Sequence, residues 1–241
     1  DDNDSNLGSI AYDADCDGIL TVNDCDDNDQ YVLLTCTDCG GSYAISGLSN
    51  ASDWSSVSTC RTIAGNLYID DFNPDPSHNN LEPLEYLRSI GGTLGITGSA
   101  QTFEGPQSLN GLSNLQSLGA LQLTYNYTAT DISALSNITS LGHLYLYESH
   151  IESLTGLENL TELNSLQIAH TYSLTDLSPL SNVTTPNADI YFYSLMIDSL
   201  TGLEGLTSLS SLTLDNSDIT NLTGLDNVTS ISQNLYLESN T

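Results

Sequence analysis

The feature that most constrains this chain is a pair of apolar residues, separated by one position, that recurs every 22 to 24 residues. Between the pairs, apolar residues fall at every third position over long stretches. An amphipathic α-helix alternates steps of three and four instead, so this period is not helical. The pattern predicts a short strand at each pair and 3-10 or extended segments between strands. The regular pairs are Leu121/Leu123, Leu144/Leu146, Leu166/Ile168, Ile190/Phe192, Leu212/Leu214 and Leu235/Leu237.

A single coil of this length cannot enclose a core, but stacked coils bring their leucines into columns and pair their strands in parallel. Each buried leucine or isoleucine contributes about 1.5–3 kcal/mol, which offsets much of the ordering entropy. The sequence therefore predicts a β-rich solenoid with a parallel sheet on one face and 3-10 or extended segments on the other. Earlier pairs extend the stack to about nine coils, the first three irregular; they are Leu67/Ile69, Leu94/Ile96 and the candidate Tyr43/Ile45.

The charge balance excludes several functions. The 241 residues include 31 Asp and Glu but only two Lys and Arg, which gives a net charge of −29. Such a chain cannot neutralise phosphates, so we expect no nucleic-acid partner. No apolar run reaches the 18 or more residues of a membrane span. The charge predicts accompanying counter-ions or divalent cations, and the start without Met or an apolar signal segment predicts a processed piece.

The segments between the later strands resemble leucine-rich repeats, most closely the 22-residue kind of bacterial internalins. The resemblance covers residues 109–241 and is carried by residues 131–141, 174–180 and 219–225. It implies a leucine-rich-repeat stack. The position of that family's asparagine ladder varies here, so we expect the turns to satisfy their backbone groups less uniformly. The residues at this position are Asn126, Ser149, Thr171, Leu195, Ser217 and Asn240.

Residues 60–69 and 90–96 resemble the extracellular L domains of growth-factor receptors. Those domains are also short β-solenoids with a disulfide-closed first coil. The resemblance implies that residues 31–108 form the cap and irregular first coils of one continuous solenoid.

The five cysteines predict an oxidising compartment. Cys16 and Cys25 are close enough in the sequence repeat to bridge, and Cys60 is expected to pair with Cys36 or Cys39. One thiol is then left over. The alternative is a zinc or redox site at Cys36 and Cys39, for which no second pair of ligands is evident.

Residues 1–30 are rich in Asp and poor in apolar residues, so they cannot form a core by themselves. Within them, residues 13–24 follow the spacing of a twelve-residue calcium loop, with Gly18 at the sharp turn. No helix pair flanks the loop, so the segment resembles thrombospondin type 3 and related bacterial Asp/Cys repeats. The alternative is a solvated acidic linker. The expected calcium ligands are Asp13, Asp15, Asp17, Ile19 through its carbonyl, Asp24, and in a second array Asp26 and Asn28.

Four Asn-x-Thr sequons share one register of the repeat, which predicts a column on the outer side of the solenoid. They are candidates for N-glycosylation; alternatively, Asn-x-Thr is simply common in this class of repeat. The four are Asn137, Asn159, Asn182 and Asn227.

Tyrosines recur between and beside the apolar pairs, where side chains point to solvent. Amphipathic rings on a rigid concave sheet predict a partner-binding face, although tyrosine also simply favours strands. The four histidines show no recurring spacing to nucleophiles, and no phosphate-binding glycine loop occurs. We therefore expect no catalytic residues. The predicted binding residues are Tyr145, Tyr147, Tyr191, Tyr193 and Tyr236.

The sequence as a whole predicts an extracellular, calcium-stabilised adhesive or binding module of a microbial surface, whose partner is a protein or glycan on another surface. The alternative is a structural subunit that stacks head to tail with copies of itself into a filament, since residues 233–241 provide no polar cap. A glycan-acting enzyme fragment is the third hypothesis and needs a pair of carboxylates at a defined separation.

Overall fold

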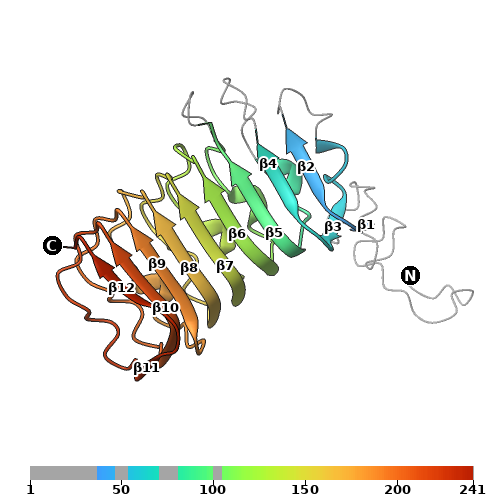
Figure 1. The fold of residues 1–241 in the computed structure, drawn as a ribbon. Coiled ribbons are helices and arrows are strands. Elements are labelled where there is room, and N and C mark those ends of the chain that lie inside the picture. The colour runs from blue at the N-terminus through green and yellow to red at the C-terminus, as the bar shows by residue number, and fades with distance from the viewer. Residues whose placement is uncertain (1–36, 47–53, 71–80, 100–104, 241) are drawn as a thin grey trace, which may run out of the picture.

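The computed structural model describes residues 37–46, 54–70, 81–99 and 105–240. Its strands lie side by side in one long sheet that runs the length of the molecule, as Figure 1 shows. The strands are β1 (Thr37–Cys39), β2 (Tyr43–Ser46), β3 (Cys60–Ile63), β4 (Leu67–Asp70), β5 (Ser89–Thr97), β6 (Ser117–Thr124), β7 (Ser140–Tyr147), β8 (Glu162–Ala169), β9 (Ala188–Tyr193), β10 (Ser208–Asp215), β11 (Ser230–Ile231) and β12 (Leu235–Glu238).

Every pairing in this sheet is parallel among the described strands, in the order β1-β3-β5-β6-β7-β8-β9-β10-β11. β2 pairs with β4, β4 also pairs with β5, and β12 pairs with β10. The second residues of the predicted apolar pairs are register partners from Ile45 on β2 to Leu237 on β12. The predicted solenoid with a parallel sheet is confirmed. The division into a cap with irregular first coils stays a prediction.

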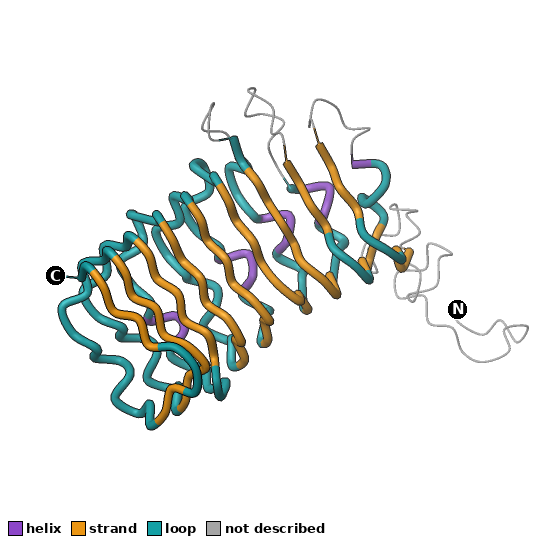
Figure 2. The backbone as a smooth tube through the Cα atoms, viewed as in Figure 1, coloured by secondary structure: helices purple, strands orange, loops and turns teal. Residues whose placement is uncertain are grey.

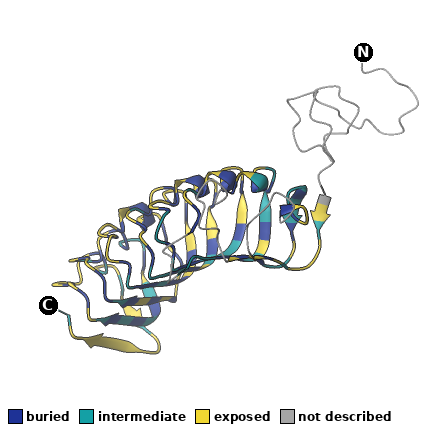
Figure 3. Cartoon of the chain, turned by 90° about the horizontal axis from the view of Figure 1, so that it is seen from above, coloured by how far each residue is buried: buried dark blue, intermediate teal, exposed yellow. Residues whose placement is uncertain are grey.

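The apolar positions of each coil point into a common core. The every-third series Ile151, Leu154, Leu157 and Leu160 is completely buried, and equivalent residues of successive coils form columns. Figure 3 shows the stack from above, with buried segments both on the strands and on the turns that face them. Stacking therefore buries the apolar side chains that a single coil would expose to water.

Short 3-10 helices lie on the side of the coil opposite the sheet, where Figure 2 shows them behind the strands. The Asp131 carboxylate accepts a hydrogen bond from the Ser133 backbone N–H at 2.9 Å, and Asp176 does the same for Ser178 at 2.8 Å. These carboxylates satisfy donors that a short helix leaves unpaired. The helices are η3 (Glu82–Leu84), η4 (Asn110–Leu112), η5 (Ser133–Leu135) and η6 (Ser178–Leu180).

The turns after the strands show the uneven ladder that the sequence predicts. Asn126, Thr171 and Leu195 are buried at this position. The Asn126 side chain bonds to the backbone of Ala129 at 3.4 Å, whereas the Thr171 hydroxyl donates to the Ala169 carbonyl at 3.3 Å. Leu195 has no polar side chain, but its N–H donates to the hydroxyl of Ser217 on the next coil at 3.1 Å. The Ser217 hydroxyl thus accepts the backbone hydrogen bond in the turn that has leucine at the ladder position.

A second asparagine column joins the coils on the outer side of the solenoid. The side-chain amides of Asn137, Asn159, Asn182 and Asn227 each donate to a backbone carbonyl of the preceding coil at 2.7–2.9 Å. This repeated bond gives a structural reason for asparagine in this register. All four side chains are exposed, and their glycosylation stays a prediction.

We expect Asn182→Ala to lower the free energy of unfolding by about 1 kcal/mol, because it removes the bond from Nδ2 to the Glu158 carbonyl at 2.7 Å. Denaturant titration measures this loss. The matched control is Asn164→Ala, which truncates an exposed asparagine on β8. Equal stability of the two variants would contradict a role for the column in joining coils.

Candidate binding face

The solvent face of the sheet carries a row of alternating tyrosines and shorter residues. Tyr145 on β7 pairs in register with Gln167, Gln167 with Tyr191 on β9, Tyr191 with Thr213, and Thr213 with Tyr236 on β12. We call these five residues the tyrosine row. Tyr191 and Tyr236 are exposed by 41% and 46%, so their rings are accessible to a partner.

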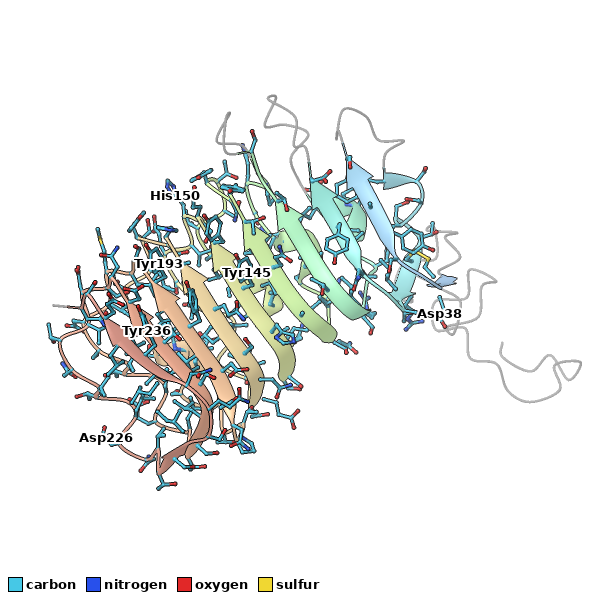
Figure 4. The ribbon with its side chains drawn as sticks, viewed as in Figure 1. Asp38, Tyr145, His150, Tyr193, Asp226 and Tyr236 are labelled. Carbon is cyan, nitrogen blue, oxygen red and sulfur yellow. A yellow bond between two sulfur atoms is a disulfide. The ribbon has the colours of Figure 1, made fainter. Side chains whose placement is uncertain are left out.

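Aromatic side chains gather a second time where the strands end. His170 lies at the centre, with ring centroids 4.9 Å from Tyr193, 5.7 Å from Tyr147 and 6.0 Å from Tyr172. Nδ1 of His170 and the hydroxyl of Tyr172 are 2.9 Å apart. Among the residues labelled in Figure 4, Tyr145 lies on its strand, whereas Tyr193 and His150 lie nearer the strand ends. We call this group the rim cluster: Tyr125, Tyr127, Tyr147, His150, His170, Tyr172 and Tyr193.

A left-handed residue directly after each of β6, β7 and β8 positions the rim cluster. Tyr125, Glu148 and His170 have φ angles of 52°, 46° and 53°. Each of their N–H groups donates to a carbonyl at the strand end of the next coil at 3.0 Å. The equivalent Asn216 is also left-handed, and asparagine and histidine tolerate this conformation better than tyrosine or glutamate. Tyr125 and Glu148 thus hold a costly conformation, as residues at functional sites often do.

Glu148 makes the rim cluster electrostatically distinct. Its carboxylate accepts a hydrogen bond from the Tyr127 hydroxyl at 2.9 Å. Burial, followed by this hydrogen bond, raises the pKa of Tyr127 from 10.0 to about 12. A hydrogen bond with Glu148 is also the main cause that raises the pKa of Tyr147, and burial raises that of Tyr145. Tyr127, Tyr145 and Tyr147 therefore stay protonated further into the alkaline range than an ordinary tyrosine does.

We expect Glu148→Gln to lower the pKa of Tyr127 from about 12 toward 10.0. The pKa should stay above 10.0, because burial of the ring also raises it. A pKa raised by folding adds stability that is complete below the unfolded pKa near 10 and lost as the pH rises through about 12. The variant should therefore lose less stability than the wild type across that window.

Phenolate absorbance measures this shift when each protein is compared with its own Tyr127→Phe form, which isolates one tyrosine. Glu152→Gln, at an exposed glutamate past the rim cluster, is the matched control. An unchanged Tyr127 titration in Glu148→Gln would show that Glu148 does not hold the proton on this phenol.

Sequence reasoning found the five predicted tyrosines on the face and rim but missed the rest of the rim cluster. The structure adds Tyr125, Tyr127, His150, His170 and Tyr172. The missed signal was an aromatic or histidine at the first or third position after a strand. The period-two pattern stops there, because the left-handed turn redirects the side chains.

Several predicted residues lie outside the described part of the chain, including every expected calcium ligand and Cys16, Cys25 and Cys36. Within the described residues, a disulfide joins Cys39 to Cys60, which decides between the two partners that the sequence left open for Cys60. The same part of the chain holds no group of three or more His, Cys, Asp or Glu arranged to bind a metal. No described helix has the length and hydropathy of a membrane span.

Comparison with solved structures supports the architecture. The chain is similar to the crystal structure of internalin C2 from Listeria monocytogenes, with a TM-score of 0.56 over 84% of this chain and 80% of that one. The fold is a leucine-rich-repeat solenoid. The two sequences are 22% identical, so the likeness concerns the fold alone. No protein-family model matches the chain, and no curated protein matches it.

Proposed function

We propose that this chain is a non-enzymatic protein-binding module that holds its partner on the tyrosine row and the rim cluster. The observation that carries this proposal is the rim cluster itself, where Tyr125 and Glu148 accept a left-handed backbone that other residues would adopt at lower cost. Tyrosines supply large contact area at a low entropy cost and combine an apolar ring with a hydrogen-bond donor. The likeness to internalin C2 adds support.

The module is an adhesive component of a microbial surface in this proposal, and it acts outside the cell. The Cys39–Cys60 disulfide supports an oxidising environment, because such bonds are rare in reducing compartments. The Asp-rich residues 1–30 would bind calcium and stiffen the connection to a preceding module.

Removal of calcium tests whether residues 1–30 bind this ion. We expect a chelator to expose residues 13–29 to proteolysis, because the carboxylates of the loop repel one another without a cation. The control is Asp13→Asn/Asp15→Asn, which should be cleaved there even with calcium present. Cleavage that is the same with and without calcium in the unmodified chain would refute the calcium loop.

The binding proposal is tested with a random peptide library displayed on phage and selected against the whole chain. Selected peptides should bind at least about tenfold more weakly to Tyr147→Ser/Tyr193→Ser, since central aromatic residues dominate interface energies. Tyr68→Ser is the control, because Tyr68 is exposed on the same sheet but lies on β4, away from the rim cluster. Peptides that bind both variants as well as the wild type would overturn the proposal.

A further variant separates binding from stability. Tyr125→Asn keeps the left-handed turn with a residue that favours it, and the relief of about 1–2 kcal/mol should exceed the loss of one ring contact, so the protein should become slightly more stable. The same change removes the edge-to-face contact between Tyr125 and Tyr147, whose centroids are 5.6 Å apart, and should weaken the selected peptides. Unchanged peptide affinity in a stabilised variant would show that this tyrosine is not retained for binding.

Self-stacking is the second candidate, and the last coil favours it. Leu222, Leu235 and Leu237 are 44–58% exposed there. Leu222 and Leu235 line a groove of about 460 Å³ together with Leu225 and Ile231. Because β10 is the one strand that pairs with β12 among the described strands, another copy could extend the sheet in parallel. Sedimentation at rising concentration should then show growing assemblies that Leu235→Asp abolishes, and a monomer at all concentrations would exclude them.

A further inference from the structure

The tyrosine row has a regular spacing that suits a particular ligand. Neighbouring strands in a sheet lie about 4.8 Å apart. Tyr145 and Tyr191 are two strands apart, as are Tyr191 and Tyr236, so successive tyrosines of the row are separated by about 9.6 Å. Gln167 and Thr213 occupy the strands between them. The row therefore contains two gaps between aromatic rings, one over Gln167 and one over Thr213.

A cation fits either gap. A group midway between two tyrosines would lie about 4.8 Å from each, within the distance of about 6 Å at which a ring attracts a positive charge. A flat guanidinium needs about 3.5 Å to each ring, so small rotations of the two side chains would close the rings onto it. Arginine suits this arrangement better than lysine, because its charge is planar and weakly hydrated.

The charges around the row select the same kind of ligand. Asp189 precedes Tyr191 by two residues, Asp215 follows Thr213 by two, and Glu238 follows Tyr236 by two, so all three carboxylates share the face. Residues two apart on a strand are separated by about 6.7 Å. The only Lys or Arg residues of the chain are Arg61 and Arg88, and both precede this part of the sheet. Its negative field is thus not balanced by a cation of its own.

We propose that the tyrosine row binds a protein segment with two arginines three residues apart, in polyproline II conformation, one guanidinium over Gln167 and the other over Thr213. In that conformation, residues i and i+3 face the same side about 9.3 Å apart, which matches the distance between the gaps. Two residues of an extended strand span only about 6.7 Å. This inference rests on the proposed function and adds the chemistry of the partner.

Labelled synthetic peptides test the spacing directly against the whole chain by fluorescence anisotropy. Each peptide carries two arginines in a proline-rich background, at a separation of two, three or four residues, and a fourth carries two lysines three apart. The Arg-x-x-Arg peptide should bind about fivefold tighter than each of the others, and salt should weaken it. Equal affinity for all four would refute the proposal and indicate nonspecific attraction to an acidic protein.

Substitutions on the binding face provide a second test of the proposal. Thr213→Tyr fills one gap without removing any tyrosine of the row and should reduce Arg-x-x-Arg binding about fivefold. Asp189→Asn/Asp215→Asn should weaken it similarly. The matched control, Glu152→Gln/Asp198→Asn, makes the same charge change at exposed positions past the rim cluster. An equal loss in the control, or unchanged binding in Thr213→Tyr, would overturn the proposal.

The peptide library distinguishes this failure from failure of the proposed function. Selected peptides that need Tyr147 and Tyr193 but contain no arginine would refute the arginine ligand and leave the binding module standing. Neutral oligosaccharides are tested in the same assay, and their capture by the tyrosine row in place of the Arg-x-x-Arg peptide would also refute it.

Discussion

Phe192→Ala is expected to lower the free energy of unfolding by about 3–5 kcal/mol. The ring is completely buried on β9, between its register partners Ile168 and Leu214. Both neighbours are held by the strands of their own coils, so they cannot collapse into the space that the ring leaves. The cost therefore includes a cavity as well as the lost burial. Urea or guanidinium titration measures it.

Two controls identify the cause. Phe192→Leu should cost only about 1 kcal/mol, because the same column holds aliphatic residues in neighbouring coils. Tyr191→Ala, one position away but exposed on the binding face, should change stability by about 0.5 kcal/mol or less. A loss in Phe192→Ala no greater than in Tyr191→Ala would show that the coils repack around the missing ring.

Gly202→Ala is expected to destabilise the protein by about 3 kcal/mol. Gly202 has a φ of 108°, a conformation that residues with a side chain rarely adopt. A Cβ there would also overlap the backbone carbonyl of Leu177 in the preceding coil. Backbone cannot move aside as a side chain does, so the two coils would have to separate. Thermal and chemical unfolding both measure the loss.

Gly40→Ala is the matched control, because a Cβ on Gly40 would meet no atom within 4 Å and Gly40 has no positive φ. Its stability should stay within about 0.5 kcal/mol of the wild type. Gly156 shares the conformation of Gly202, with a φ of 105°, and its Cβ would likewise meet backbone of the preceding coil, so Gly156→Ala should behave like Gly202→Ala. Losses no larger than the control's would show that the coils tolerate a wider separation.

The fold could be predicted from the sequence because each coil repeats the same pattern of apolar residues that must be buried. Apolar pairs such as Leu144 and Leu146 must face inward on a strand, and this alternation also places Tyr145 outward. The tyrosines of the sheet were therefore predictable along with the core. Only the inward positions carry a burial signal, whereas the outward ones depend on register alone.

The rim cluster was not predictable from the same rule. His170 and Tyr125 follow the last strand residue, and their left-handed φ angles turn the side chains toward the strand end. No single residue type marks this turn, since tyrosine, glutamate, histidine, serine and asparagine all occupy it. The calcium loop expected within residues 13–24 lies outside the described residues and stays a prediction from carboxylate spacing alone.

In this parallel sheet each coil adds one strand, so residues in register are spaced at a constant interval of about 4.8 Å. Duplicating a coil between β9 and β12 would move Tyr236 away from Tyr191 by one increment of about 4.8 Å, and deleting one would bring it nearer by the same amount. Recombination between near-identical repeats could thus change the ligand spacing in whole steps while leaving the packing of each remaining coil intact.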